Sequence, residues 1–149
     1  MIEPVKTEYL MTLEGSIGEP SLINNLMVFN VLSGHIKGPG ISGEMQAPAG
    51  DWARVMPNGN WKLDVRFTIL LDDGNPAYVQ YHGVVCMTEE MANRVEEGDT
   101  LNGDEIYFRS APYFETTSEK YDFLNNIVCV GKLRSFGGGN VVYDIFKVL

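Results

Sequence analysis

The sequence predicts a single all-β domain, an antiparallel up-and-down β-barrel of about eight strands with one or two short helices. Three observations lead to this fold class. Apolar and polar residues alternate with a period of two in about eight segments. The turns between these segments are too short to contain the helical crossovers that parallel strands require. The two helical stretches are too short to cover so large a sheet, so the sheet must close on itself to bury its apolar face.

Eight segments show the alternation that is typical of strands, and they are residues 9–17, 26–36, 41–46, 61–71, 77–87, 105–116, 126–133 and 141–149. Turn signals rich in Gly, Pro and Asn lie between them, at residues 18–21, 38–40, 57–60, 72–75 and 136–140. Because each turn joins consecutive segments, a meander is the simplest topology. The chain of 149 residues contains no linker or repeat, so we expect one domain over residues 1–149.

Two stretches are predicted to be helical. Thr88 can cap a helix over residues 89–98, which starts with two glutamates and ends at Gly98. Thr116 and Glu119 match a capping box ahead of a single helical turn.

Composition excludes several classes of partner. The chain has 11 Lys and Arg against 20 Asp and Glu, a net charge of -9, which disfavours nucleic acid and anionic membrane surfaces. The N-terminus lacks a basic start followed by an apolar segment, and no apolar run is long enough to span a bilayer, so we expect a cytoplasmic protein. Cys86 and Cys129 lie in apolar runs and are expected to be reduced and structural.

The sequence offers no metal site and no cofactor site. His35 and His82 are the two histidines, and neither belongs to a metal-binding or triad motif. Residues 38–43, GPGISG, match the dinucleotide-binding pattern G-x-G-x-x-G, but no helix is predicted after them, and Pro39 removes one amide that a phosphate loop needs. We therefore interpret these glycines as a tight turn within the barrel.

Residues 61–87 form the clearest hairpin. With Asp73 and Gly74 as a two-residue loop, Arg66 is expected opposite Tyr81, and Asp64 opposite Gly83. A three-residue turn would change this register. Two alternatives remain open: the polar face with Asp64 and Arg66 is exposed to water, or it lines the lumen, where Gly83 leaves room for a ligand.

At this point the sequence resembles a known family, domain of unknown function 3237, also called uncharacterised protein family 0311. The resemblance covers nearly the whole chain. In the first half it rests on the Lys37 to Gly43 segment, Gly50-Asp51-Trp52, Pro57, Gly59, residues 63–66, residues 72–74, Tyr81 and Gly83. In the second half it rests on residues 107–109, Pro112, residues 114–116, Tyr121, Leu124-Asn125 and residues 130–131. Phe123 stands where the family pattern has a tryptophan. The resemblance implies a compact antiparallel β-barrel, and no activity is established for the family as a whole.

Seven side chains are candidates for ligand binding, and they are Asp51, Trp52, Arg66, Tyr81, Tyr107, Tyr121 and Asn125. Asp51 and Trp52 are expected in a loop, where they rim a pocket or form a turn that plugs the barrel end. The tyrosines can hold a carbonyl oxygen or simply pack, and Asn125 can orient a ligand or cap the short helix.

Three side chains are candidates for catalysis, and they are Asp64, Glu115 and Arg109. In this hypothesis one of the carboxylates moves a proton next to a carbonyl, while Arg109 stabilises the oxyanion. The same Arg109 can instead form a structural pair with Asp64 or Glu115.

Three functions remain open. The first is the binding of a small, partly apolar organic molecule, carboxylated or phenolic, in the barrel lumen. The second is a cofactor-independent isomerase, cyclase or hydro-lyase. The third is a filled barrel that acts through self-association, as a homo-oligomer. An inward carboxylate with a raised pKa beside a cavity favours the enzyme, a cavity without such an acid favours binding, and a filled barrel favours self-association.

Overall fold

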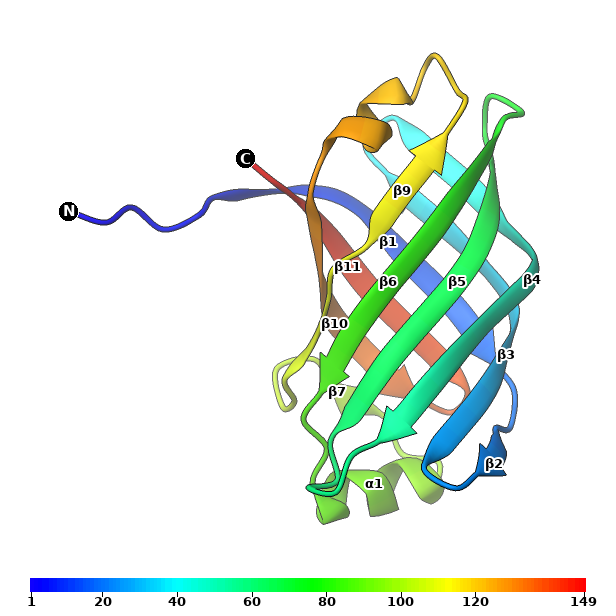
Figure 1. Cartoon of the computed structure of the whole chain (residues 1–149), viewed down its shortest axis with the longest axis vertical. Coiled ribbons are helices and arrows are strands. Elements are labelled where there is room, and N and C mark those ends of the chain that lie inside the picture. The colour runs from blue at the N-terminus through cyan, green and yellow to red at the C-terminus, as the bar shows by residue number, and fades with distance from the viewer.

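Eleven strands form one sheet that closes into an antiparallel barrel in the computed structural model, which describes residues 1–149 (Figure 1). The strands are, in chain order, β1 (Thr7–Ile17), β2 (Ser21–Ile23), β3 (Leu26–Gly38), β4 (Ile41–Val55), β5 (Trp61–Leu71), β6 (Pro76–Val85), β7 (Leu101–Asn102), β8 (Phe108–Ser110), β9 (Tyr113–Thr116), β10 (Cys129–Gly137) and β11 (Asn140–Val148). The helices are α1 (Glu89–Glu96) and a 3-10 helix, η1 (Asp122–Asn126). Neither helix is long and apolar enough to cross a membrane.

Strands that follow one another in the chain are neighbours in the barrel. The order is β1, β3, β4, β5, β6, then β8 and β9, then β10 and β11, and β11 pairs back with β1. The strands β8 and β9 together occupy one position, because Pro112 interrupts the segment predicted at 105–116. Short β2 pairs with β3, and β7 pairs with β10. The predicted up-and-down barrel of eight strands is confirmed.

The β5–β6 hairpin has a different register from the predicted one. The Leu71 N–H donates to the Asn75 carbonyl and the Gly74 N–H donates to the Leu71 carbonyl, so the loop is Asp72-Asp73-Gly74. Gly74 takes a φ of 84°, which glycine adopts most easily. The extra residue shifts every pair by one position, so that Tyr81 lies opposite Val65 and not Arg66.

This register decides which face of the hairpin is inside. Leu63, Val65 and Phe67 of β5 are buried, and Val79 and Tyr81 of β6 join them. Asp64 and Arg66 point outward, so the first of the two open alternatives holds for β5. The prediction that Tyr81 lies opposite Arg66, and so shares its polar face, is wrong because it assumes the two-residue loop.

Strand β4 is much longer than the predicted 41–46. It continues to Val55, so Asp51 and Trp52 lie in a strand and not in a loop. Its pairing with β5 shifts between Gln46 and Gly50. Pro48 lies in this irregular part, where a residue without an N–H removes no ladder hydrogen bond. The predicted turn at GPGISG is confirmed, since Gly38 pairs with Ile41 across two turn residues.

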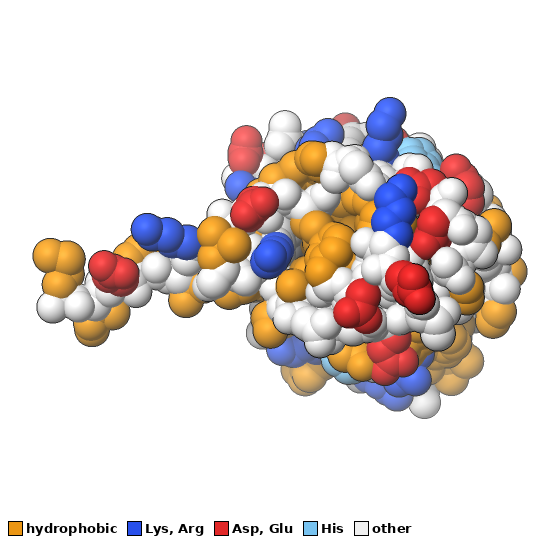
Figure 2. Space-filling model, turned by 90° about the horizontal axis from the view of Figure 1, so that it is seen from above, with side chains coloured by type: hydrophobic (Ala, Val, Ile, Leu, Met, Phe, Trp, Pro, Cys, Tyr) orange, Lys and Arg blue, Asp and Glu red, His pale blue; other side chains and the backbone are white.

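Both ends of the barrel carry a helix (Figure 1). At one end lies α1, whose Met91 and Val95 pack against the core. At the other end lies η1, whose Leu124 is buried. The predicted capping box is wrong, because Thr116 stays in β9, where its hydroxyl donates to the Pro76 carbonyl, and η1 begins only at Asp122. Seen from the η1 end, apolar side chains fill the centre and the N-terminal residues extend away from the barrel (Figure 2).

Candidate functional site

A cavity of about 60 Å3 lies inside the barrel and is partly open to solvent. It is almost entirely apolar. The residues that line it are Leu13, Gly15, Ile17, Phe29, Val31, Met45, Asp51, Trp61, Leu63, Val65, Phe67, Tyr81, Phe108, Phe136, Val141 and Tyr143. A single water needs roughly 10–15 Å3, so the space holds a few waters or a small organic fragment.

Asp51 supplies the carboxyl group of this cavity. Alternation along β4 turns its side chain inward, opposite Val65 of β5. Its Oδ1 accepts a hydrogen bond from the Asp64 N–H at 3.2 Å. Burial raises the pKa of Asp51 to about 6, the Asp64 N–H opposes this shift, and the negative charge of Asp64 adds to it. The group therefore changes its protonation state close to neutral pH.

Two tyrosines bring hydroxyl groups to the same cavity. Tyr81 of β6 is 6% exposed and Tyr143 of β11 is 4% exposed, and their ring centroids are 5.8 Å apart in an edge-to-face arrangement. Phe67 and Phe108 hold the two rings from the other sides. Burial raises the pKa of each tyrosine far above its usual value, and the charge of Asp51 raises both further. Both phenols therefore stay protonated near neutral pH.

The cavity thus unites two predicted residues, Asp51 and Tyr81, with one that the sequence reasoning missed. Tyr143 lies in the segment predicted at 141–149, where it shares its face with Val141 and Ile145. That alternation was the available signal. An inward tyrosine among apolar neighbours is recognisable as a cavity residue only when the other walls are known.

The three candidate catalytic residues do not converge. Asp64 points outward, 3.6 Å from the Arg66 Nε, and its Oδ1 is buried without a hydrogen bond. Arg109 lies over the ring of Tyr107, 5.1 Å from its centroid, and donates to the Phe108 carbonyl. Arg109 forms no ion pair with Asp64 or Glu115, so the alternative of a structural pair is wrong.

The outward position of these residues follows from strand parity. Arg109 alternates with buried Phe108 and Ser110 on β8, and Glu115 alternates with buried Phe114 on β9. Glu115 accepts a hydrogen bond from the outward Tyr113 hydroxyl. Of the ligand-binding candidates, Trp52 and Tyr107 are likewise on the outside, 43% and 56% exposed.

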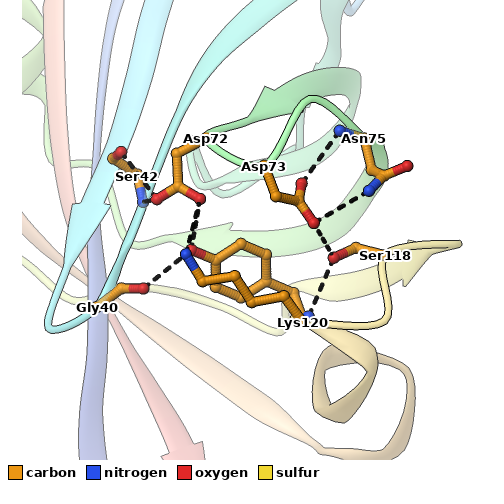
Figure 3. A network of polar contacts seen from close by, with 8 residues as sticks. Gly40, Ser42, Asp72, Asp73, Asn75, Ser118 and Lys120 are labelled. Carbon is orange, nitrogen blue, oxygen red and sulfur yellow. Dashed lines mark hydrogen bonds and ion pairs between the residues drawn. The ribbon is translucent and has the colours of Figure 1, made fainter.

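Tyr121 belongs to a polar network that closes one end of the barrel, and Figure 3 shows its partners Gly40, Ser42, Asp72 and Lys120. Its hydroxyl donates to Asp72 Oδ1 at 2.6 Å, and the Gly40 carbonyl oxygen lies 2.9 Å from the Tyr121 hydroxyl oxygen. The Ser42 N–H and hydroxyl donate to the other oxygen of Asp72. Lys120 adds an ion pair to Asp72 at 3.5 Å. Tyr121 therefore links the β3–β4 turn to the β5–β6 turn.

Asn125 performs a related structural task. Its Oδ1 accepts from the Thr116 N–H, and its Nδ2 donates to the Thr116 carbonyl and to Asp122. These bonds fasten η1 to β9.

Asp73, the residue after Asp72 in the β5–β6 turn, accepts a hydrogen bond from the hydroxyl of Ser118, a buried residue in the loop before η1 (Figure 3). No three His, Cys, Asp or Glu side chains lie close enough together to hold a metal ion.

The comparisons with known proteins agree with this fold. The family described as "Protein of unknown function (DUF3237)" matches residues 5–148. A UPF0311 protein of Rhodopseudomonas palustris is 28% identical over 154 residues, covering 100% of both chains. The crystal structure of a conserved protein of unknown function from Rhodopseudomonas palustris superposes on the chain with a TM-score of 0.93 at 29% identity, again over 100% of both.

Two further proteins are similar. A UPF0311 protein of Clostridium acetobutylicum is 28% identical over 135 residues, 89% of this chain and 83% of the relative. A crystal structure of a protein of unknown function from that organism gives a TM-score of 0.86 at 26% identity over 100% of both chains. An enzyme from Penicillium herquei gives a TM-score of 0.70 at 17% identity, covering 100% of this chain and 98% of the other. At that identity the likeness shows the fold alone.

Proposed function

The chain belongs to the DUF3237 family of proteins of unknown function, and from the geometry of its barrel we propose that it binds a small, mainly apolar organic molecule in the lumen. The observation that carries this proposal is the cavity, whose apolar walls are joined by the polar side chains of Asp51, Tyr81 and Tyr143. Apolar walls with a few convergent polar groups are the usual form of a small-molecule site. A barrel that acts only through self-association needs no such space.

The size of the cavity limits the ligand. Sites for drug-sized molecules measure roughly 300–1,000 Å3, against about 60 Å3 here. The bound part of the ligand is therefore a fragment of a few heavy atoms, and a larger molecule must extend through the open side.

Xenon and benzene are suitable probes, because both enter small dry apolar cavities. We expect each to shift the amide resonances of lumen-lining residues in a saturable way in 1H–15N spectra. Val141→Phe places a ring in the cavity and should abolish these shifts. The matched control is Val84→Phe, since Val84 alternates with buried Gly83 and Val85 on β6.

Probe shifts that are absent from the lumen residues, or that survive Val141→Phe unchanged, contradict lumen binding. If Val84→Phe also removes them, the loss reflects a damaged barrel, and a smaller filling variant, Val31→Leu, then decides between the two outcomes.

A second candidate function is a cofactor-independent proton-transfer enzyme, and Asp51 is the observation that favours it. An inward carboxyl whose pKa lies at about 6 beside a cavity is the arrangement that general acid–base catalysis uses. In this candidate function Asp51, and not Asp64 or Glu115, moves the proton next to the carbonyl. Turnover of small enolisable ketones, measured as deuterium exchange from solvent and lost in Asp51→Asn, tests this candidate.

A further inference from the structure

We propose that Asp51, Tyr81 and Tyr143 form one hydrogen-bonding site for a single uncharged oxygen of the ligand, so that the lumen takes neutral ketones and alcohols and rejects carboxylates and amines. This inference rests on the proposed function and adds to it the chemical class of the ligand. Four features of the cavity support it.

The first feature is a pair of hydroxyl groups that border the cavity and have one O–H group without a protein acceptor. Tyr81 and Tyr143 are each more than nine-tenths buried, and both line the cavity. The two hydroxyls interact with each other, which accounts for one of their two O–H groups, and neither makes a hydrogen bond to the backbone or to Asp51. Buried tyrosine hydroxyls usually find a partner. A ligand oxygen in the cavity provides one.

The second feature is the position of Asp51. Its Oδ1 is held by the Asp64 N–H, which orients the carboxyl group. The other oxygen, Oδ2, makes no hydrogen bond to protein. All three polar groups line the same small cavity, and the charge of Asp51 acts on both phenols. One ligand oxygen can therefore interact with the carboxyl and with a phenol together.

The third feature is the charge of the lining. Asp51 is the single carboxyl group, and the cavity contains no Lys, Arg or His. A ligand carboxylate would lie beside Asp51 without a counter-ion, which is costly in an apolar cavity. A ligand ammonium would lose its hydration for one carboxylate that is itself poorly solvated. Only an uncharged group meets no such cost.

The fourth feature is the protonation state of Asp51. With a pKa of about 6, the carboxyl donates a hydrogen bond at pH 5 and only accepts at pH 7.5. Asp64 on β5 is the charged neighbour, and it is paired outward with Arg66. From β6 and β11 the facing groups are the two phenols, and from β3 the residue opposite is Phe29. A ketone only accepts hydrogen bonds, so its binding is favoured at pH 5. An alcohol can donate a hydrogen bond to the ionised carboxylate, so its binding is favoured at pH 7.5.

The experiment uses four probes of the same shape, cyclopentanone, cyclopentanol, cyclopentanecarboxylate and cyclopentylamine, titrated by 1H–15N spectra at pH 5 and 7.5. We expect cyclopentanone to bind roughly thirtyfold more weakly at pH 7.5 than at pH 5, because only the protonated fraction of Asp51 binds it. Cyclopentanol should show the opposite trend, and the two charged probes should not enter the lumen.

Asp51→Asn should remove both pH trends and keep ketone binding at pH 7.5, since the amide donates a hydrogen bond at every pH. Tyr143→Phe should weaken both neutral probes by roughly threefold to tenfold. The control is Asp104→Asn, because the Asp104 side chain is 89% exposed. If xenon enters the lumen but the pH trends are absent, or a charged probe binds as well as a neutral one, this inference is wrong and lumen binding stands. If xenon does not enter, both fail.

Discussion

Asp51 on β4 and Tyr81 on β6 pair with the same residue, Val65 of β5, from its two sides. The side chains of Asp51, Val65 and Tyr81 therefore form one row across three adjacent strands, and all three face the lumen. Adjacent strands are about 4.8 Å apart, so the two backbones are separated by roughly 10 Å, and the charge of Asp51 still raises the pKa of Tyr81. An ionised Asp51 carboxylate in the lumen lowers the free energy of unfolding, and this effect can be measured.

We predict that Asp51→Asn stabilises the protein at alkaline pH. The carboxyl has a pKa of about 6 in the folded chain and 3.8 as its ordinary value. Between these values the folded state binds more protons than the unfolded state, so the free energy of unfolding falls as the pH rises. The full shift corresponds to about 3 kcal/mol at pH 8. Urea denaturation of both proteins at pH 4 and pH 8 should show a gain at pH 8 that largely disappears at pH 4.

Asp104→Asn provides the comparison, since its exposed carboxyl should leave the difference between the two pH values unchanged. A loss of stability in Asp51→Asn at both pH values means that the fold itself needs the carboxylate. In that case the group is structural and not held for a ligand.

Asp64→Asn and Arg109→Ala should leave the binding of neutral probes to the lumen within about twofold of the wild type. Both side chains lie on the outer surface, Asp64 beside Arg66 and Arg109 over Tyr107. The measurement is the probe titration at pH 5, where Asp51 is mostly protonated and the charge of Asp64 matters least. A tenfold loss in either variant places part of the site outside the lumen.

The sequence was sufficient for the barrel because its signals are local. Alternation over eight segments and short turns predict antiparallel neighbours, and the structure contains both the strands and the short turns. The register of β5 and β6 was not predictable in the same way, because it depends on whether Gly74 closes a two-residue or a three-residue loop. A shift of one residue moved Tyr81 from the outer face to the lumen.

The site was predictable only in part. Asp51 shares its parity with Met45, which also lines the cavity, so the signal for an inward carboxyl was present. This signal was not used because Pro48 lies between Met45 and Asp51, and a proline argues against a continuous strand. Tyr143 comes from the far end of the chain, and no local pattern tells which tyrosine of a strand borders an unfilled space.

Tyr121→Phe should lower the melting temperature by a few degrees at pH 7. The lost hydroxyl is the largest cause of the lowered pKa of Asp72, so the folded state loses part of its preference for the ionised carboxyl. A depressed pKa contributes stability above the ordinary value of 3.8, and this contribution is lost as the pH falls below it. The effect of the substitution should therefore shrink towards pH 3.

Thermal unfolding followed by circular dichroism measures this difference, with Tyr113→Phe as the control. Tyr113 also bonds a carboxyl group, that of Glu115, but on the exposed outer face. Equal losses in the two variants would show that the link between the two turns adds nothing beyond an ordinary surface contact.

The last prediction concerns a close approach between β8 and β10. Gly131 pairs with Ser110, and a methyl group at position 131 would collide with the Ser110 hydroxyl oxygen while staying 3.7 Å from its Cβ. Gly131→Ala should therefore destabilise the barrel by about 1–3 kcal/mol, the usual cost of overpacking. Ser110→Ala removes the oxygen that collides. The double variant should regain most of the loss, and chemical denaturation of the two single variants and the double variant gives the coupling energy. Additive losses would mean that the glycine is required by its backbone and not by its neighbour.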